Sequence, residues 1–137
     1  MVNLTSISVT SPDGTSFSIY PASSRSAPIS ALVDTGVTYT FLPASIVEGV
    51  ASRLNAWHEV GEWKVDCTLR NTAGTVDFGF GGGLVIKVPY VDFVLKLGDE
   101  TCSLGMQSRG GEEEGDSILG DTFLRGAYGE FCPSSSL

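Results

Sequence analysis

The residues with the clearest chemical potential form the tripeptide Asp34-Thr35-Gly36, which directly follows an apolar run ending at Val33. That run, Ile29–Val33, is rich in aliphatic and β-branched residues, which predicts a buried strand leading into a tight turn. Glycine in the turn permits a backbone conformation and a close approach that a side chain would obstruct. A carboxylate at such a strand end can act as a general acid or base. Alternatively, it closes an Asx-turn by bonding the backbone two residues on.

A second segment, Ser-Ile-Leu-Gly-Asp-Thr-Phe-Leu-Arg at residues 117–125, is far more specific than the tripeptide. Together the two segments resemble the pepsin-like aspartic proteases, and specifically their C-terminal lobe. Residues 15–18 and 74–82 look closest to the fungal, yapsin-like branch of that family. In the family, the Ile-Leu-Gly strand crosses beside the Asp-Thr-Gly loop, and a short helix opens at the following Asp.

This resemblance implies a role for each residue around Asp34. Aspartic proteases are the established example of two carboxylates about 3 Å apart that share one proton, because like charges that close cannot both ionise. Asp34 would be one of the pair, Thr35 would join the hydroxyl network that locks two such loops together, and Gly36, Thr38 and Ile118 would contact substrate. The resemblance implies a peptide or protein substrate, and neither a cofactor nor a metal.

Only one such loop is present, and none of the other seven aspartates has a comparable setting; Asp121 is predicted to be a helix N-cap. We therefore expect a chain that is inactive alone and needs a second, N-terminal lobe. Val37 also departs from the family, which usually has a hydroxyl residue there that bonds the carboxylate. The likeness covers residues 1–128 as one lobe, and residues 129–137 form a divergent, Ser-rich tail in place of the closing apolar strand. The missing strand pairing predicts an exposed edge and poor solubility.

Two alternatives remain open on sequence alone. A chain with one Asp-Thr-Gly could pair with a second copy and build a symmetric dyad, as retroviral-type proteases do. A chain that keeps half of a cleft could instead bind peptides without cleaving them. The length and the Ile-Leu-Gly-Asp-Thr-Phe-Leu-Arg block favour the lobe of a two-lobed enzyme over both.

Charge and hydropathy exclude several classes of partner. The chain has 137 residues, with 8 Lys and Arg against 16 Asp and Glu, which gives a net charge of −8. Nucleic acids and anionic membranes both require clustered positive charge, so neither is expected as a partner. No apolar run approaches the roughly 18–20 residues needed to cross a bilayer. The first residues lack the basic start and apolar core of a signal peptide, whereas the family resemblance implies an extracellular, vacuolar or cell-surface location.

The three cysteines also bear on the cellular location of the protein. The family resemblance implies a disulfide between Cys67 and Cys102, although two buried thiols in a cytosolic protein would fit the same sequence. Cys132 has no assigned role. The tripeptide Asn3-Leu4-Thr5 has the pattern of an N-glycosylation acceptor, which has meaning only in a secreted protein.

The elements that must position Asp34 are predicted to be mostly short strands. Alternating apolar residues predict strands over residues 2–10, with a bulge near Thr5, around Phe17 and Ile19, and over 65–69, 76–80, 84–88 and 91–95. Ile46, Val50 and Leu54 mark the buried face of one mid-sized helix. The only histidine, His58, has no second ligand at a useful spacing, so it is expected at an edge or the surface. We expect an all-β lobe with orthogonally packed sheets, one mid-sized helix and one short helix.

Overall fold

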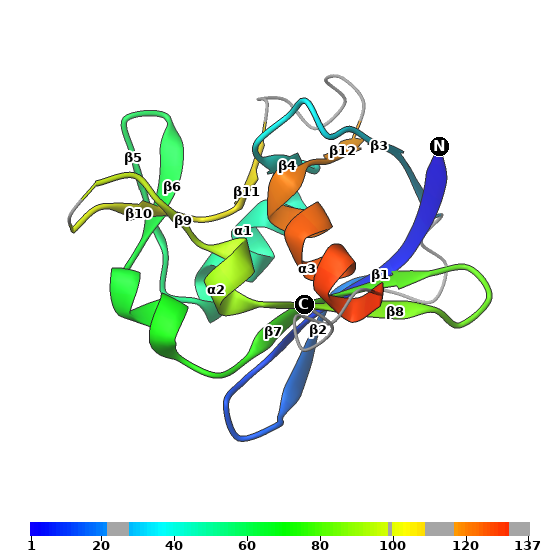
Figure 1. Cartoon of the computed structure of the whole chain (residues 1–137), viewed down its shortest axis with the longest axis horizontal. Helices are drawn as coiled ribbons and strands as arrows, with labels where there is room; N and C mark the ends of the chain where they lie inside the picture. The colour runs from blue at the N-terminus through cyan, green and yellow to red at the C-terminus, as the bar shows by residue number, and fades with distance from the viewer. Residues whose placement is uncertain (22–27, 99, 109–116, 132–137) are drawn as a thin grey trace.

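The computed structural model describes residues 1–21, 28–98, 100–108 and 117–131, and short strands make up most of its regular structure (Figure 1). The strands are β1 (Val2–Thr10), β2 (Ser16–Tyr20), β3 (Ile29–Val33), β4 (Thr40–Phe41), β5 (Trp57–Glu59), β6 (Glu62–Val65), β7 (Thr75–Phe80), β8 (Val85–Pro89), β9 (Leu95–Lys96), β10 (Cys102–Ser103), β11 (Met106–Gln107) and β12 (Ser117–Leu119). The helices are α1 (Ala44–Arg53), the 3-10 helix η1 (Cys67–Asn71), α2 (Tyr90–Phe93) and α3 (Asp121–Phe131).

Two sheets carry the fold. The larger has eight strands in the order β11-β4-β12-β3-β1-β7-β8, with β2 paired to β1, and the smaller has four in the order β5-β6-β10-β9. The predicted all-β character is therefore confirmed. No helix in the described ranges is long and apolar enough to cross a membrane.

The first strand has the bulge that the sequence predicts. Leu4, Ile7 and Val9 are buried, and the change of phase between Leu4 and Ile7 coincides with a register shift against β7. The β1–β2 hairpin then closes through a turn in which the Gly14 N–H donates to the Ser11 carbonyl at 2.9 Å. Gly14 has a φ of +90°, a conformation that favours glycine.

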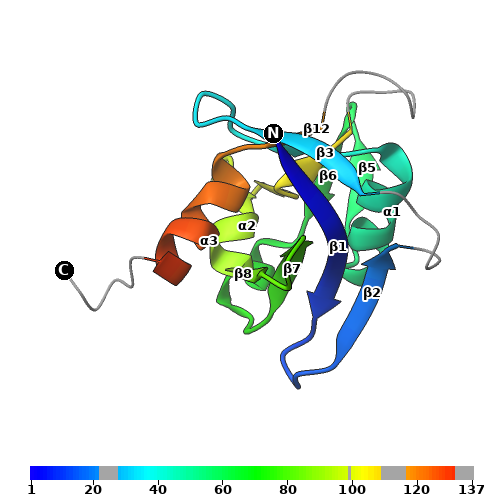
Figure 2. The ribbon, with the colours of Figure 1, turned by 90° about the vertical axis from the view of Figure 1, so that its right-hand side faces the viewer.

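The strand nearest the end of the chain, β12, lies between two early strands. It pairs in parallel with β3, beside which it lies in Figure 2, and antiparallel with β4. The prediction that β3 is a buried strand is wrong in part: Ala31 is fully buried, but Leu32 and Val33 are each 41% exposed. The reason is that the described residues cover only one face of β3.

Helices pack against the larger sheet and fill the core. Helix α1 buries Ile46 and Val50 as predicted, and Leu54 directly after it is also buried. Helix α3 lies against β8 (Figure 1), and its Phe123 ring meets the ring of Phe78, on the neighbouring strand β7, edge-on at a centroid distance of 5.0 Å. Helix α3 has 11 residues, longer than the short helix expected, so the predicted boundary at residue 128 falls within it.

Two segments predicted to be extended are helical. Residues 67–69 lie in η1 because the Asp66 side chain accepts the Thr68 N–H at 2.9 Å and so starts a helical turn. Residues 91–93 lie in α2, which begins after Pro89 and buries Tyr90 and Phe93 three positions apart. Short apolar runs do not distinguish a strand from a helix by periodicity alone.

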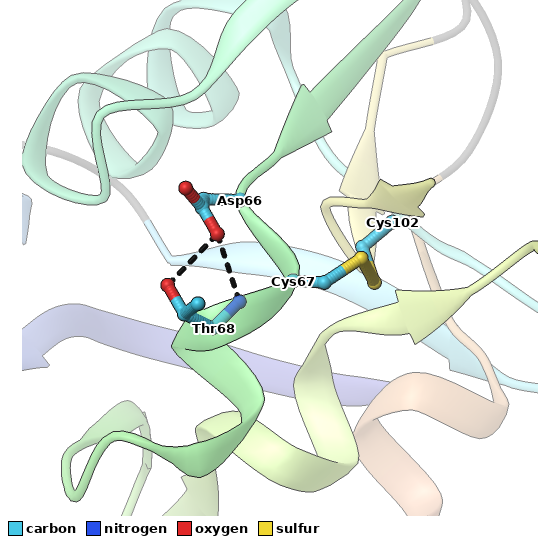
Figure 3. Close-up of a disulfide and its surroundings, with 4 residues drawn as sticks. All are labelled: Asp66, Cys67, Thr68 and Cys102. Atoms are coloured by element: carbon cyan, nitrogen blue, oxygen red, sulfur yellow. Dashed lines mark hydrogen bonds between the residues drawn. A yellow bond between two sulfur atoms is a disulfide. The ribbon is translucent and has the colours of Figure 1, made fainter. Parts of the chain in front are cut away.

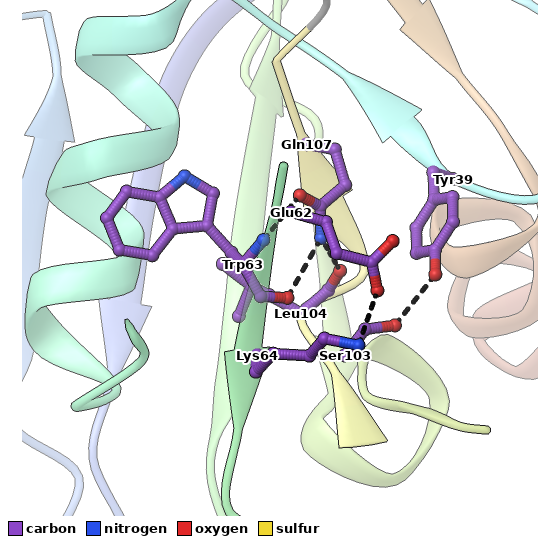
Figure 4. A network of polar contacts seen from close by, with 7 residues as sticks. All are labelled: Tyr39, Glu62, Trp63, Lys64, Ser103, Leu104 and Gln107. Atoms are coloured by element: carbon purple, nitrogen blue, oxygen red, sulfur yellow. Dashed lines mark hydrogen bonds and ion pairs between the residues drawn. The ribbon is translucent and has the colours of Figure 1, made fainter. Parts of the chain in front are cut away.

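A buried glutamine fastens the small sheet to the large one (Figure 4). Gln107, on β11, accepts the Trp63 N–H through Oε1 at 2.9 Å. Its Nε2 donates to the Trp63 carbonyl at 3.1 Å and to the Leu104 carbonyl at 2.7 Å. The side-chain amide thus joins β11 of the large sheet to β6 of the small sheet, at a point just beyond the pairing of β6 with β10.

Candidate active site

Asp34 directly follows the last residue of β3, where its half-buried side chain sits among exposed neighbours. Its backbone N–H donates to the Leu119 carbonyl at 3.1 Å, so the end of β12 fixes the main chain at this point. The carboxylate is therefore carried on a strand end that is paired to a buried neighbour rather than on a free loop. A carboxylate in such a place is held in position yet remains open to solvent on one side.

Gly36 supplies the hydrogen bond that orients this carboxylate. The Gly36 N–H donates to Asp34 Oδ1 at 2.8 Å, and of the residues described no other donor reaches the carboxylate. The arrangement is an Asx-turn, so the two interpretations of the tripeptide are compatible. Gly36 is not among the residues with positive φ, which removes the conformational reason for glycine proposed from the sequence. A Cβ at Gly36 would lie 3.3 Å from Asp34 Oδ1, a tight contact.

The loop after Asp34 is fastened to the start of α3. The Asp121 N–H donates to the Val37 carbonyl at 2.8 Å, and the Thr122 N–H donates to the Thr38 carbonyl at 3.1 Å. Asp121 lies within the first turn of α3. The N-terminal amides of this helix, which have no partners within the helix itself, thus hold the loop in place.

A buried pair of threonines supports the same junction, and sequence reasoning did not identify it. Thr40 and Thr122 are fully buried, and their hydroxyl oxygens are 3.2 Å apart. Thr122 Oγ1 also lies 2.7 Å from the Gly105 carbonyl oxygen. Because a hydroxyl has one proton, Thr122 donates to that carbonyl and accepts a hydrogen bond from the Thr40 hydroxyl. The one available signal was that Thr122 belongs to the segment that carries the family resemblance.

Gly120 lies where the two segments cross. A Cβ built on Gly120 would come within 2.3 Å of the Tyr39 carbonyl oxygen and 2.5 Å of the Val37 carbonyl oxygen. Only glycine permits this approach between β12 and the loop after Asp34. The Ile-Leu-Gly segment therefore crosses beside the Asp-Thr-Gly loop, as the resemblance implied.

The residues predicted to contact substrate lie close to Asp34 but differ in exposure. Gly36 and Thr38 are exposed, whereas Ile118 is only 6% exposed. Ile118 is in register with Leu32 on one side and with Phe41 on the other. Ile118 does not belong to the main core cluster. Ile118, Leu32 and Phe41 therefore form a small apolar face on the other side of the sheet.

Other titratable groups have structural partners instead of a shared site. Asp77 is buried and accepts hydrogen bonds from the hydroxyls of Thr10 and Thr75, with Lys87 Nζ 3.4 Å away. His58 is exposed on β5, as expected, and its ring meets Trp63 edge-on. Within the described ranges, no three His, Cys, Asp or Glu side chains gather in a way that could hold a metal ion.

The predicted disulfide is present. Cys67 and Cys102 are bonded, with their Cα atoms 5.2 Å apart, and they join the start of η1 to β10 (Figure 3). Beside it, the backbone N–H and the hydroxyl of Thr68 both donate to Asp66, and they hold the pKa of that carboxyl below its usual value of 3.8. Cys132 and the rest of the predicted tail from residue 132 lie outside the described residues.

An apolar groove of about 680 Å³ opens next to the crossing of β12 and the loop after Asp34, between the start of β1 and α3. Asn3 and Val33 line it on the sheet side, Leu84 near the β7–β8 turn, and Phe123 and Tyr128 on the helix side. Asp34 is not among its lining residues, although the preceding residue is.

Three comparisons with known proteins bear on this site. The family model described as "Eukaryotic aspartyl protease" matches residues 2–134. The chain is 34% identical over 99 residues to Secreted aspartic protease 9 of Candida albicans, covering 71% of this chain and 18% of that protein. It is 37% identical over 100 residues to the aspartic proteinase yapsin-3 of Saccharomyces cerevisiae, covering 72% and 19%. It therefore spans about a fifth of the length of these curated relatives.

Among solved structures, the fold is similar to that of the aspartic proteinase from Irpex lacteus, with a TM-score of 0.62 and 18% identity. The match covers 88% of this chain and 36% of that one, and at this identity it bears on the fold alone. The resemblance to pepsin-like aspartic proteases, with its fungal character, is confirmed.

Proposed function

Because this chain belongs to the eukaryotic aspartyl protease family, we propose that it is one lobe of a two-lobed aspartic endopeptidase and that Asp34 is one of its two catalytic carboxylates. The second carboxylate comes from another lobe, because the remaining aspartates of the described part have other partners or settings. The observation that carries the proposal is the Asp34 carboxylate itself. It is oriented by the Gly36 N–H at a strand end that β12 holds in place.

The chemistry requires the two carboxylates to share a proton. The ionised one removes a proton from a water molecule, and the protonated one donates a hydrogen bond to the carbonyl oxygen of the scissile peptide. The water oxygen then bonds to the carbonyl carbon, and the C–N bond breaks once the nitrogen has gained a proton. The Gly36 amide holds the Asp34 carboxylate in a fixed orientation for this chemistry, because it donates to Oδ1 at 2.8 Å. No cofactor takes part in this scheme.

The neighbouring residues have supporting roles in the proposal. Thr35 is exposed beside Asp34 and is available to bond the equivalent loop of the other lobe. Gly36 and Thr38 are exposed on the same loop, where a substrate backbone can approach. Ile118 contributes to the apolar face that it shares with Leu32 and Phe41. Substrates in this proposal are peptides or proteins that bind in extended form.

The same proposal sets the location of the protein. A disulfide between Cys67 and Cys102 persists in an oxidising compartment. One relative is described as a secreted aspartic protease. We therefore place the working protein in the secretory route or beyond it, in an extracellular, vacuolar or cell-surface setting.

A chimera tests the catalytic role of Asp34. This chain replaces the C-terminal lobe of yapsin-3, so that the relative supplies the other lobe, and cleavage of a denatured protein is measured at acid pH. We expect cleavage by the chimera and a loss of at least 100-fold in kcat with Asp34→Asn, on the order of the contribution of a general acid or base. The matched control, Asp13→Asn, changes an exposed turn residue and should retain activity.

The full chain alone provides the second half of the test. Light scattering should report a monomer, and the acid-pH assay should report no cleavage that depends on Asp34. Cleavage by a dimer of the chain, abolished by Asp34→Asn, would favour the self-pairing enzyme instead. A chimera that forms its disulfide and binds peptide but is indifferent to Asp34→Asn would favour a binding module, and the proposal would be wrong.

A further inference from the structure

Asn3 is a sequence feature that the proposed function does not use. The sequence Asn3-Leu4-Thr5 matches the acceptor pattern Asn-X-Ser/Thr, and it is the only such match in the 137 residues. The other two asparagines, Asn55 and Asn71, are followed two positions later by Trp57 and Ala73. A single acceptor makes the site simple to assign and to remove.

The fold turns the Asn3 side chain toward solvent. Strand β1 alternates, and because Leu4 is fully buried in the core, its neighbour Asn3 faces the opposite way and is exposed. On β3, the residue paired with Asn3 is Ser30, which is also exposed and has a small side chain. The folded chain can therefore carry a bulky group at this position without repacking the core.

Space is available on the other side of Asn3 as well. Asn3 lines the mouth of the apolar groove of about 680 Å³, together with Gly81 and Leu84 at the β7–β8 turn. Leu84 is 47% exposed. A sugar attached to Asn3 would stand at the rim of this groove, next to the half-exposed side chain of Leu84.

We propose that Asn3 is an N-glycosylation site of this protein, an inference that rests on the secretory location in the proposed function. The co-reactant is a lipid-pyrophosphate-linked oligosaccharide. The Asn3 amide nitrogen forms a bond to C1 of the reducing-end sugar and loses one proton to a base of the transferase. The bond between C1 and the pyrophosphate oxygen breaks, and the lipid pyrophosphate leaves with the electron pair. The Thr5 hydroxyl serves recognition by the transferase and is not consumed.

The test expresses the full chain behind a cleavable secretion signal in yeast and compares four versions: wild type, Asn3→Gln, Thr5→Ala and Thr5→Ser. Gel mobility is measured before and after treatment with an endoglycosidase. We expect one glycoform for the wild type and for Thr5→Ser, which keeps the acceptor pattern, and none for Asn3→Gln or Thr5→Ala. Because glycan transfer precedes folding, a destabilised variant still reports on the site.

The disulfide keeps a negative result informative. A wild-type chain that has formed the Cys67–Cys102 bond has been in the oxidising lumen; if it shows no endoglycosidase shift, the inference is overturned. A shift that persists in Asn3→Gln also overturns it. Asp34→Asn should be glycosylated like the wild type. The proposed function is tested separately in the chimera, so glycosylation of the chain together with a chimera that is indifferent to Asp34→Asn would contradict only the proposed function.

Discussion

Gln107 and Trp63 are joined by a pair of hydrogen bonds, in which the buried side-chain amide of Gln107 accepts from the Trp63 N–H and donates to the Trp63 carbonyl. Side-chain contacts such as this one connect the smaller sheet to the larger one. The Trp63 carbonyl also accepts the Leu104 N–H at 3.0 Å, so removal of the Gln107 side chain leaves the Trp63 N–H and the Leu104 carbonyl without this partner.

Gln107→Leu should therefore lower the free energy of unfolding by about 3 kcal/mol, since it leaves buried carbonyl and amide groups unpaired. Urea unfolding followed by tryptophan fluorescence measures the change. Lys96→Leu, a polar-to-leucine change on an exposed position of the same small sheet, is the control and should be close to neutral. A cost for Gln107→Leu no larger than the control's would show that the two sheets do not depend on this amide.

Gly120→Ala should destabilise the fold by about 3 kcal/mol, because the new methyl group would overlap the Val37 and Tyr39 carbonyl oxygens. In the chimera it should also reduce kcat, since the displaced loop carries Asp34. Gly81→Ala is the matched control, because a Cβ there meets nothing within 4 Å. Equal urea midpoints for the two variants would contradict the crossing described above.

Loss of the disulfide should cost about 4 kcal/mol, the loop-closure value for a sequence separation of 35 residues. The double variant Cys67→Ser/Cys102→Ser, compared with wild type in urea, measures this loss. A thiol titration of the denatured protein should count one free thiol before reduction and three after it, since the sequence has three cysteines. Three thiols without reductant would contradict the bond.

Tyr90 should give stability a dependence on alkaline pH. Burial, and then the charge of Asp77, raise the pKa of Tyr90 above its ordinary value of 10.0. A raised pKa means that the folded state holds the proton of Tyr90 more tightly than the unfolded state does. The contribution of Tyr90 to stability is therefore fully present at pH values below its unfolded-state pKa. It is lost as pH rises through the folded-state pKa. Urea midpoints measured from pH 8 to pH 11 should fall.

The control for that experiment is Tyr90→Phe. It removes the hydroxyl that donates to the Thr10 carbonyl at 2.8 Å and should cost about 1 kcal/mol near neutral pH. Its midpoints should decline less between pH 8 and pH 11 than those of the wild type. Parallel declines for the two proteins would assign the alkaline loss to other groups.

Asp66 should titrate below 3.8 in a carboxyl NMR experiment, because Thr68 donates two hydrogen bonds to its charged form. Its contribution to stability is present above the unfolded-state pKa and is lost as pH falls through the lower, folded-state value. Thr68→Ala removes the hydroxyl but keeps the backbone donor, so the titration midpoint of Asp66 should rise part of the way towards 3.8. A midpoint unchanged by Thr68→Ala would contradict the role of the hydroxyl.

Local patterns predicted the hairpins of this fold, because the strands β1, β2, β7 and β8 alternate and are separated by glycine-containing turns. The crossing of the segment ending at Gly120 beside the loop after Asp34 came from family resemblance, since no local pattern relates residues so far apart in sequence. The pair Thr40 and Thr122 remained hidden for the same reason. Their burial follows from how β4 and α3 meet, and a threonine in a short extended segment gives no sign of it.

Helices caused the main errors. Residues 90–93 contain apolar residues that suit either a strand or a helical turn, and tertiary packing of Tyr90 and Phe93 decided between them. At Asp66 a side-chain cap outweighed the alternation of Val65, Cys67 and Leu69. The exposure of Leu32 and Val33 was missed because apolar composition does not report which face of a strand is covered.

The position of β12 between β3 and β4 has a consequence for how the chain folds during synthesis. A strand made from residues 117–119 must enter the middle of a sheet whose flanking strands were translated some eighty residues earlier. Such long-range pairing is slow because its loop-closure entropy must be overcome first. Until β12 arrives, the facing edges of β3 and β4 stay open on the ribosome, and the nascent chain is then most exposed to aggregation and to chaperone binding.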